Sequence, residues 1–441
     1  MSFRRLLVLA LLWGCSDKAG QPPNSPDVST GEASGASAAG ASGAGTAEAG
    51  AGGQLLGVGG QPGAAPNALG SSGVCGFTAP VEYGAAAADG LVDVPPNDPN
   101  IFYMGRVDCK PEGPAFAFPA VSLRVRFVGS ALDLRLRDSG TGGAQSTNYY
   151  DVSIDGAAPT RLEVAAGDHV YRLARDLADG EHSAEVVKRV ESNTNSGKGQ
   201  VLGLRVRAGS TLLPVRQKPL RVEFVGDSIT CGYGDEVSTT TPDNFHYTTL
   251  NSNANAAYGA VAARQLDAEY VAVAVSGRGV YRNYGGGAGE LAPVFYNDTL
   301  PDDTTAPPWD FTRYLPDVVV VNLGTNDFSP PGPDHDAYKA AYTSFLKQIR
   351  GHYPAALLLA VVGPMLSDSY PAGVQAWTTV QSDVSGVVNE LSAQGDANVH
   401  FLALTPQSAP YGEDYHPTLA THQQMAQAVV GEIRRLLGSQ P

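Results

Sequence analysis

The chain has 441 residues and a formal net charge of −15, with 29 Lys and Arg against 44 Asp and Glu. This length suffices for two domains that each bury a core of their own. Because the charge is acidic and no Lys or Arg cluster occurs, we expect neither a nucleic-acid partner nor a polybasic membrane-binding patch.

The first residues have the pattern of an export signal. Arg4 and Arg5 precede a short apolar run, residues 6–13, that is too brief to span a bilayer. We therefore predict a signal peptide over residues 1–14. The phrase Leu12-Trp13-Gly14-Cys15 resembles the lipobox of bacterial lipoproteins, which implies a lipidated Cys15 and a cell-surface or outer-membrane protein whose only membrane contact is the lipid anchor. The alternative is an ordinary signal peptide, an incidental Cys15 and a secreted protein.

Residues 15–74 consist largely of Gly, Ala, Ser and Pro. Such a segment cannot bury enough apolar surface to fold. We predict a disordered tether between the export signal and the folded part of the chain.

Three cysteines follow Cys15 in the sequence. Export permits disulfides. Cys75 and Cys109 fall in the same predicted domain, so we expect a bridge between them, whereas Cys231 should remain a buried thiol. The spacing of Cys and His suggests no metal site, and we expect no cofactor.

Residues 75–212 show the period-two alternation of half-buried strands. Alternation is clearest in residues 123–127 and 132–136, which are separated by the turn residues Gly129-Ser130. Further strand-like runs occupy residues 150–154, 169–173, 185–190 and 201–207. Many short strands without a convincing helix predict an all-β jelly roll or sandwich.

Residues 213–441 show a different pattern, in which apolar runs alternate with helical periodicity. The apolar runs are residues 222–225, 270–275, 318–321 and 357–362. Runs of this kind are buried on both faces of a parallel sheet. The helical segments are residues 255–266, 336–350, 374–391 and 417–437. The alternation predicts a three-layer α/β domain.

Four polar clusters occur in this domain, each where an apolar run ends or a helix begins. They are Gly226-Asp227-Ser228, Ser276-Gly277-Arg278-Gly279, Gly324-Thr325-Asn326-Asp327 and Asp414-Tyr415-His416-Pro417. In open α/β sheets the reactive groups lie beyond the carboxyl ends of the strands. Together these clusters supply a nucleophile, a base, a carboxylate and donors for an oxyanion, the parts that acyl transfer requires.

The four clusters, in this order, resemble the motifs of the SGNH (GDSL) hydrolase family. That resemblance implies a flavodoxin-like parallel sheet, with Ser228 as nucleophile and His416 as general base. It also implies an oxyanion hole made by the N–H groups of Ser228 and Gly277 and the amide of Asn326.

The family's usual acid lies three residues before the histidine, where this chain has Glu413. The Asp-aromatic-His-Pro phrase that begins at Asp414 resembles carbohydrate esterase family two instead, as do Met104-Gly105-Arg106 and Asn148-Tyr149-Tyr150 in the β domain. We therefore favour Asp414 as the acid that orients His416. Glu413 or a backbone carbonyl remains an alternative.

The resemblance implies an esterase that removes O-acetyl groups from a polysaccharide or oligosaccharide. Two other functions stay open. One is a lipase, phospholipase or thioesterase on the same scaffold, because the fold does not fix the acyl group. The other is a surface lipoprotein that binds polysaccharide without catalysis.

Sugar contacts are predicted for Arg278, Tyr415, Trp377 and Trp309, although aromatic residues are more often part of a core. The long segment 284–314 should border the active site. Asp227 and Asp327 are expected to be structural.

Overall fold

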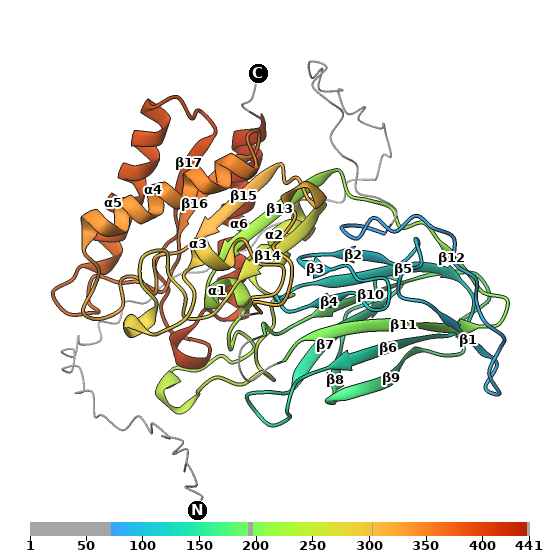
Figure 1. Cartoon of the computed structure of the whole chain (residues 1–441). Helices are drawn as coiled ribbons and strands as arrows, with labels where there is room; N and C mark the ends of the chain where they lie inside the picture. Colours follow the sequence, from blue (N-terminus) through green and yellow to red (C-terminus); the bar gives the residue numbers. More distant parts are fainter. Residues whose placement is uncertain (1–71, 193–196, 302, 439–441) are drawn as a thin grey trace, which may run out of the picture. The chain divides into compact units, whose positions relative to one another are not determined.

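The computed structural model describes residues 72–192, 197–301 and 303–438, and all of them belong to one compact unit (Figure 1). The predicted signal peptide, Cys15 and the tether up to residue 71 lie outside the described residues. Residues 72–74, which we assigned to the tether, are described and packed: the N–H of Val74 donates to the carbonyl of Tyr103 at 3.0 Å. The reason is the apolar side chain of Val74, which is buried in the core.

The N-terminal part is an antiparallel β-sandwich, which confirms the predicted all-β domain. Its two six-stranded sheets have the orders β3-β4-β11-β6-β9, with β1 beside β11, and β12-β5-β10-β7-β8, with β2 beside β5. The strands are β1 (Leu91–Val94), β2 (Phe102–Met104), β3 (Val107–Asp108), β4 (Ala115–Phe116), β5 (Ser122–Val128), β6 (Leu132–Asp138), β7 (Asn148–Ile154), β8 (Thr160–Val164), β9 (Gly167–Ala174), β10 (Glu181–Lys188), β11 (Gly199–Arg207) and β12 (Thr211–Leu213).

Strands β5 and β6 are the two runs with the clearest alternation, and the turn between them does not join a hairpin. The side chains of β5 alternate between buried and half-buried, as the pattern predicted. However, β5 and β6 lie in different sheets. Gly129, with φ of 154°, carries the chain across from one sheet to the other. The alternation shows which face of a strand is buried but says nothing about which strand it pairs with.

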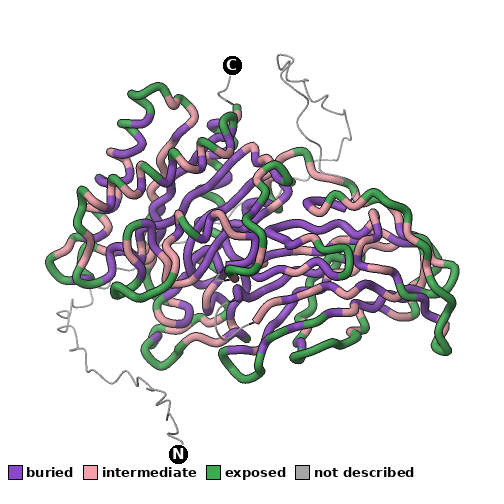
Figure 2. The backbone as a smooth tube through the Cα atoms, viewed as in Figure 1, coloured by how far each residue is buried: buried purple, intermediate pink, exposed green. Residues whose placement is uncertain are grey.

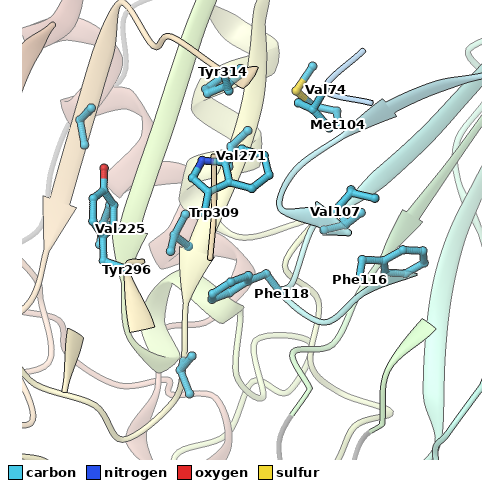
Figure 3. Packing of buried hydrophobic residues seen from close by; sticks show 14 of the residues in the cluster. Val74, Met104, Val107, Phe116, Phe118, Val225, Val271, Tyr296, Trp309 and Tyr314 are labelled. Carbon is cyan, nitrogen blue, oxygen red and sulfur yellow. The ribbon is translucent and has the colours of Figure 1, made fainter. Parts of the chain in front are cut away.

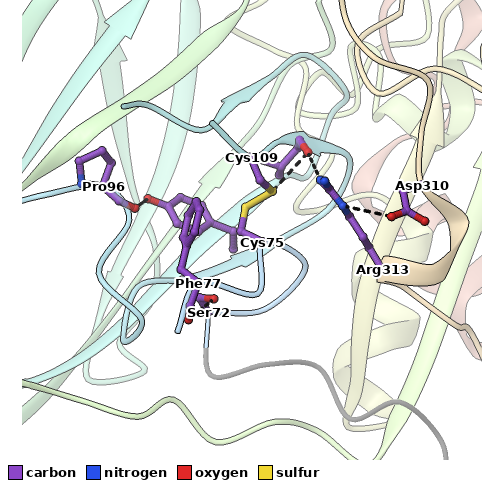
Figure 4. Close-up of a disulfide and its surroundings, with 9 residues drawn as sticks. Ser72, Cys75, Phe77, Pro96, Cys109, Asp310 and Arg313 are labelled. Atoms are coloured by element: carbon purple, nitrogen blue, oxygen red, sulfur yellow. Dashed lines mark hydrogen bonds and ion pairs between the residues drawn. A yellow bond between two sulfur atoms is a disulfide. The ribbon is translucent and has the colours of Figure 1, made fainter. Parts of the chain in front are cut away.

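The predicted disulfide between Cys75 and Cys109 is present and ties the start of the sandwich to the segment after β3 (Figure 4). Arg313, from the second domain, donates to the carbonyl of Val107 beside this bridge. Cys231 is a buried free thiol, as expected.

The C-terminal part is built on a five-stranded parallel sheet of order β14-β13-β15-β16-β17. This is the flavodoxin-like arrangement, and it confirms the predicted fold class. The strands are β13 (Leu220–Gly226), β14 (Ala268–Ala274), β15 (Val318–Asn322), β16 (Leu357–Val362) and β17 (Val399–Ala403). The helices are α1 (Ser228–Cys231), α2 (Tyr258–Gln265), α3 (Ala292–Phe295), α4 (His335–His352), α5 (Ala376–Ala393) and α6 (Leu419–Gly438). Short 3-10 turns are η1 (Pro242–Asn244), η2 (Tyr284–Gly286), η3 (Phe311–Arg313) and η4 (Glu413–Tyr415).

Helices cover both faces of this sheet, which gives the three layers. Helices α2 and α6 pack against the face that includes Phe224 and Val320. Helices α4 and α5 pack against the opposite face, through Val319 and Val321 among others. The central strands are therefore buried along their whole length (Figure 2), which is why their sequences are uninterrupted apolar runs.

The two domains share one continuous core. Arg106, on the sandwich, is fully buried and its guanidinium donates to the carbonyl of Tyr296 at 2.8 Å. It also forms an ion pair with Glu223 of β13, and it lies 4.8 Å from the ring centre of Trp309. We call this contact, made by Arg106, Glu223, Tyr296, Trp309 and Phe311, the domain seam. Figure 3 shows two of its rings, Tyr296 and Trp309, between the two domains.

Candidate active site

Ser228 stands at the carboxyl edge of the parallel sheet. Strand β13 ends at Gly226, and the next residue, Asp227, caps α1 by accepting a hydrogen bond from the N–H of Ile229 at 3.1 Å. Helix α1 then begins with Ser228 itself. This abrupt change from strand to helix holds the hydroxyl at the end of the sheet.

His416 comes to the same place from the other end of the chain. Its Nε2 lies 2.8 Å from the Oγ of Ser228, across 188 residues of sequence. Its Nδ1 lies 3.0 Å from the carbonyl oxygen of Glu413. Because a carbonyl can only accept, Nδ1 must carry the proton and Nε2 presents its lone pair to the serine. The imidazole is therefore in the tautomer that can take a proton from Ser228.

The partner of His416 is thus a backbone carbonyl, and the carboxylate of Asp414 that we favoured is not in that position. Asp414 points elsewhere: its carboxylate accepts from the hydroxyl of Tyr233 at 2.6 Å and the N–H of Tyr247 at 3.1 Å. It also pairs with Nδ1 of His246 at 2.8 Å. The physical reason is the backbone, because Asp414 and Tyr415 have φ of 47° and 64°, and this left-handed turn directs the Asp414 side chain away from the imidazole.

Tyr233 is a residue that the sequence did not point to. Its ring stacks on the His416 imidazole, with centroids 3.9 Å apart and an angle of 20°. Burial raises the pKa of Tyr233, as does the neighbouring Asp414 carboxylate, so the phenol keeps its proton and donates to Asp414. The Asp414 carboxylate therefore acts on His416 through Tyr233, and His246 helps to hold that carboxylate.

The carboxylate of Glu413 holds the same turn from the other side. It accepts from the N–H of Thr248 at 2.7 Å, from that residue's hydroxyl at 2.8 Å, and from Asn251 at 2.6 Å. The N–H of Glu413 donates to the carbonyl of Gly234 at 3.1 Å. A side chain at Gly234 would meet the Cβ of Glu413 at 2.3 Å, so this close approach requires glycine. The carbonyl that faces His416 is thus fixed on both sides.

Burial shifts the pKa values of His416 and Asp227 in opposite directions. It lowers the pKa of His416 to about 4, against the hydrogen bond that the imidazole donates to the backbone carbonyl of Glu413, which raises it. The imidazole is consequently neutral near pH 7, ready to accept a proton. Burial also raises the pKa of Asp227 to about 7, and the neighbouring Asp327 acts in the same direction.

The three predicted oxyanion donors lie on the loops around Ser228. The N–H groups of Ser228 and Gly277 have no hydrogen-bond partner within the described residues. Gly277 has φ of 76°, and a Cβ there would project into open space. The amide of Asn326 donates to the carbonyl of Arg278 at 2.8 Å and to Asp227 at 3.2 Å. Asn326 can therefore serve a third acceptor only by releasing one of these bonds.

Asp327 has a structural position, as does Asp227 at the cap of α1. The Asp327 carboxylate accepts from the N–H groups of Val280, Tyr281 and Arg282, at 3.1, 2.7 and 2.9 Å. These bonds anchor the loop that follows Gly277.

Comparison with known proteins places both domains in characterised families. Residues 103–215 match the carbohydrate esterase 2 N-terminal model, and residues 224–424 match the GDSL-like lipase/acylhydrolase family. An acetylxylan esterase / glucomannan deacetylase of Cellvibrio japonicus is 30% identical over 345 residues, which cover 77% of this chain and 90% of that protein. The chain belongs to carbohydrate esterase family 2.

Two further relatives agree with this assignment to carbohydrate esterase family 2. The cellulase/esterase CelE of Acetivibrio thermocellus is 36% identical over 345 residues, covering 78% of this chain. The match spans 40% of the length of CelE, which is a longer protein. A family two carbohydrate esterase from Clostridium thermocellum, solved in complex with cellohexaose, has a TM-score of 0.70 and 35% identity, covering 77% of this chain and 99% of that one.

The predicted sugar contacts of this family 2 esterase separate into two groups. Tyr415 is next to His416, its ring is 47% exposed, and its hydroxyl donates to Asp243 at 2.6 Å. The backbone of Arg278 holds Asn326, and its side chain donates to the carbonyl of Ala288 at 2.8 Å. These two residues lie on the loops of the site.

The two tryptophans belong to the packed interior. Trp309 is 4% exposed and lies against Arg106 in the domain seam, so its predicted role in sugar binding is wrong. Its large apolar ring is used to bury a charged guanidinium between the domains. Trp377, at the start of α5, is half-buried and packs against the core.

The long segment 284–314 contacts the loops of the active site and also the domain seam. At its start, the N–H of Tyr284 donates to the carbonyl of Gly277 at 2.9 Å, and Tyr284 is 63% exposed. Further along, Tyr296 and Trp309 enter the domain seam. The segment therefore borders the site at one end only.

In residues 72–192, 197–301 and 303–438, no group of three or more His, Cys, Asp or Glu side chains is arranged to hold a metal ion. No helix of the described chain is both long and apolar enough to cross a bilayer.

Proposed function

We propose that this esterase removes O-acetyl groups from a polysaccharide through an acyl-enzyme on Ser228. The Ser228 oxygen attacks the acetyl carbonyl while its proton passes to Nε2 of His416. His416 then gives that proton to the sugar oxygen as the ester bond breaks. Water, deprotonated by the same imidazole, attacks the acetyl-serine and releases acetate.

The observation that carries this proposal is the 2.8 Å contact between the Ser228 hydroxyl and a neutral imidazole whose tautomer is fixed by a carbonyl. It is the arrangement that nucleophilic catalysis by serine requires. The backbone carbonyl of Glu413 takes the place that a carboxylate has in a full triad. The carboxylates of Glu413 and Asp414 serve to hold the turn and the Tyr233 ring.

The negative oxygen of the tetrahedral intermediate would bind the N–H groups of Ser228 and Gly277. Both are without a partner among the described residues, which leaves them available to the substrate. Asn326 adds a third donor by exchanging its longer bond, at 3.2 Å to Asp227, for the oxyanion. Each such donor is worth about 2.7–4 kcal/mol of transition-state stabilisation.

An acetylated polysaccharide as substrate is supported by the relatives. One of them carries the name acetylxylan esterase / glucomannan deacetylase, and another was solved with cellohexaose. The exposed rings of Tyr415 and Tyr284 flank the loops of the site and offer apolar faces on which a sugar can lie.

Export belongs to the same proposal, because a polysaccharide substrate lies outside the cytoplasm. Its support is the sequence of residues 1–15, with two arginines, an apolar run and Cys15. Metabolic labelling with a radioactive fatty acid tests the lipid anchor: we expect label on the chain that is lost in Cys15→Ser. A secreted and unlabelled chain would reject the anchor.

The function is tested by the rate of ester hydrolysis against acyl chain length. We expect p-nitrophenyl acetate to be hydrolysed best, with a steep decline towards longer chains, and we expect acetate to be released from acetylated xylan or glucomannan. Ser228→Ala should abolish both activities without changing the melting temperature. Preference for long chains would support a lipase or thioesterase instead. Polysaccharide binding with no hydrolysis would support a binding protein.

A further inference from the structure

A buried carboxylate from the β-sandwich reaches the carboxyl edge of the parallel sheet. Glu191 follows β10 and is 3% exposed. One of its oxygens accepts from the N–H of Ser276 at 2.7 Å, and the other accepts from the hydroxyl of Ser276. Ser276 comes directly before Gly277, whose N–H is a proposed oxyanion donor. A residue of one domain thus holds a catalytic loop of the other.

The same carboxylate lies beside the helix that carries the nucleophile. Cys231 is buried in the single turn of α1 that begins with Ser228, and burial raises the pKa of its thiol, as does the neighbouring Glu191 carboxylate. Glu191 therefore holds the backbone segment that presents the N–H of Gly277 and lies beside the segment that presents the N–H of Ser228. Asn326 also contacts both segments, through Arg278 and Asp227.

The orientation of the Gly277 N–H depends on such support. Gly277 has φ of 76° and open space on the side where a Cβ would stand, so the residue itself does not restrict the peptide plane. On the far side, the carbonyl of Gly277 accepts from Tyr284 at 2.9 Å. On the near side, the restraint is the pair of bonds from Ser276 to Glu191.

A buried cation of the sandwich opposes the cost of burying this carboxylate. Burial raises the pKa of Glu191, whereas its hydrogen bonds to Ser276 and the charge of the fully buried Lys188 lower it. The Nζ of Lys188 donates to Asn148 at 3.4 Å and to the carbonyl of Val190. The negative group near the oxyanion is thus offset in part by a positive one.

We propose that Glu191 is a positioning residue of the oxyanion hole: by holding Ser276 beside α1, it sets the spacing between the N–H groups of Ser228 and Gly277. This inference rests on the proposed function of those two groups. It gives the β-sandwich a part in the chemical step. It also predicts that loss of Glu191 weakens transition-state binding more than substrate binding.

The test compares kcat and KM for an acetyl ester in Glu191→Ala, Glu191→Gln and Glu191→Asp. We expect Glu191→Ala to lower kcat by about 10- to 100-fold, less than the 10²–10³ for losing a donor outright, with KM within about twofold of the unmodified protein. Glu191→Gln should lose less, because its amide can still accept from the Ser276 N–H and donate to the hydroxyl. If Glu191→Ala does not fold, Glu191→Asp replaces it, since the shorter side chain cannot reach both groups.

Glu269 provides a matched control. It is a buried carboxylate at the opposite end of β14, and it too contacts the sandwich, through Arg124 at 2.6 Å. Glu269→Ala should lower the melting temperature and leave the kcat of the folded enzyme unchanged. The affinity for an alkyl boronic acid, which forms a tetrahedral anion on a reactive serine, should fall in Glu191→Ala by the same factor as kcat.

Three results distinguish a failure of the positioning role of Glu191 from a failure of the proposed function. Unchanged kcat in a folded Glu191→Ala protein, or in Glu191→Asp if that variant replaces it, would overturn the positioning role. Equal losses of kcat in Glu191→Ala and Glu269→Ala would also overturn it, because they would show a general effect of the domain contact. Full activity in Ser228→Ala would instead reject the proposed function itself.

Discussion

The domain seam and the edge of the sheet around Ser228 are built from similar residue types in opposite ways. In the seam, Arg106 is enclosed by three aromatic rings, a carboxylate and backbone carbonyls. At the edge, the N–H groups of Ser228 and Gly277 have no partner within the described residues, and two successive non-glycine residues adopt left-handed backbone. The seam buries a charged group among aromatic rings to hold two domains together, whereas the edge keeps donors available and holds a strained turn. We therefore expect changes in the domain seam to affect stability and changes at the edge to affect catalysis. The substitutions and the pH profile below test this expectation.

The largest effect is expected at the edge, in His416→Ala. Without the imidazole, no group described here can take the proton of Ser228, so kcat should fall by about 10⁴- to 10⁶-fold. The melting temperature should change little, because the buried side chain lies at the carboxyl edge of the sheet and outside the hydrophobic core. Hydrolysis of p-nitrophenyl acetate and thermal unfolding measure the two quantities. A large loss of stability would mean that the edge is structural as well.

Trp309→Ala tests the seam, and Tyr415→Ala is its counterpart at the site. Removal of the Trp309 ring should lower the free energy of unfolding by about 3–5 kcal/mol, while kcat of the folded protein stays the same. Tyr415→Ala should raise KM for an acetylated oligosaccharide about three- to tenfold without changing stability, because its ring is exposed beside His416. Denaturant titration of both variants measures the free energy of unfolding, and steady-state kinetics measure kcat and KM. The opposite assignment of effects would restore Trp309 as a sugar contact.

A smaller effect is expected for Asp414→Asn. An aspartate that directly orients a catalytic histidine is worth about 10⁴ in kcat when changed to asparagine. Here the His416 partner is the carbonyl of Glu413, and Asp414 contacts Tyr233, whose ring stacks on the imidazole. We therefore expect a decrease of about tenfold. The matched variant Tyr233→Phe, which keeps the stacked ring and loses its bond to Asp414, should show a similar decrease. A 10⁴-fold loss of kcat in Asp414→Asn would instead show that the Asp414 carboxylate orients His416 directly.

The smallest effect is expected from pH between about 5 and 6.5. Burial lowers the pKa of His416 to about 4, so the base stays neutral over this range and kcat/KM should be nearly flat, falling only as the pH approaches 4. The stability due to the neutral imidazole is present above about pH 6.5, the ordinary histidine pKa, and is lost as the pH falls towards 4.

Asp227 supplies the control for this pH profile. Burial raises its pKa to about 7, so an inflection near pH 7 that disappears in Asp227→Asn belongs to Asp227. An inflection near pH 6.5 that persists in Asp227→Asn would contradict the lowered pKa of His416.

The parallel sheet could be predicted from the sequence because β13 to β16 are buried on both faces and read as continuous apolar runs. Strand β17 was missed, since it is largely half-buried and includes the polar His400. In the sandwich, the alternation of β5 and β6 gave their buried faces but not their partners. Pairing between strands depends on contacts distant in sequence, which a local pattern does not contain.

The site was predictable in its chemistry and less so in its contacts. Ser228 and His416 could be paired because both stand at the same edge of the sheet. The partner of His416 could not, because it depends on the left-handed turn at Asp414 and Tyr415. Trp309 and Glu191 act across the contact between domains, and no spacing in the sequence indicates such a contact.

The most direct test of the account is covalent labelling of the nucleophile. We would treat the protein with one equivalent of an alkyl phosphonofluoridate, map the modified peptide by mass spectrometry, and measure acetate release from p-nitrophenyl acetate in the same samples. The account predicts that activity is lost in proportion to the label on Ser228, and that Ser228→Ala takes up no label. Acetate release that continues undiminished in a protein fully labelled at Ser228 would contradict it.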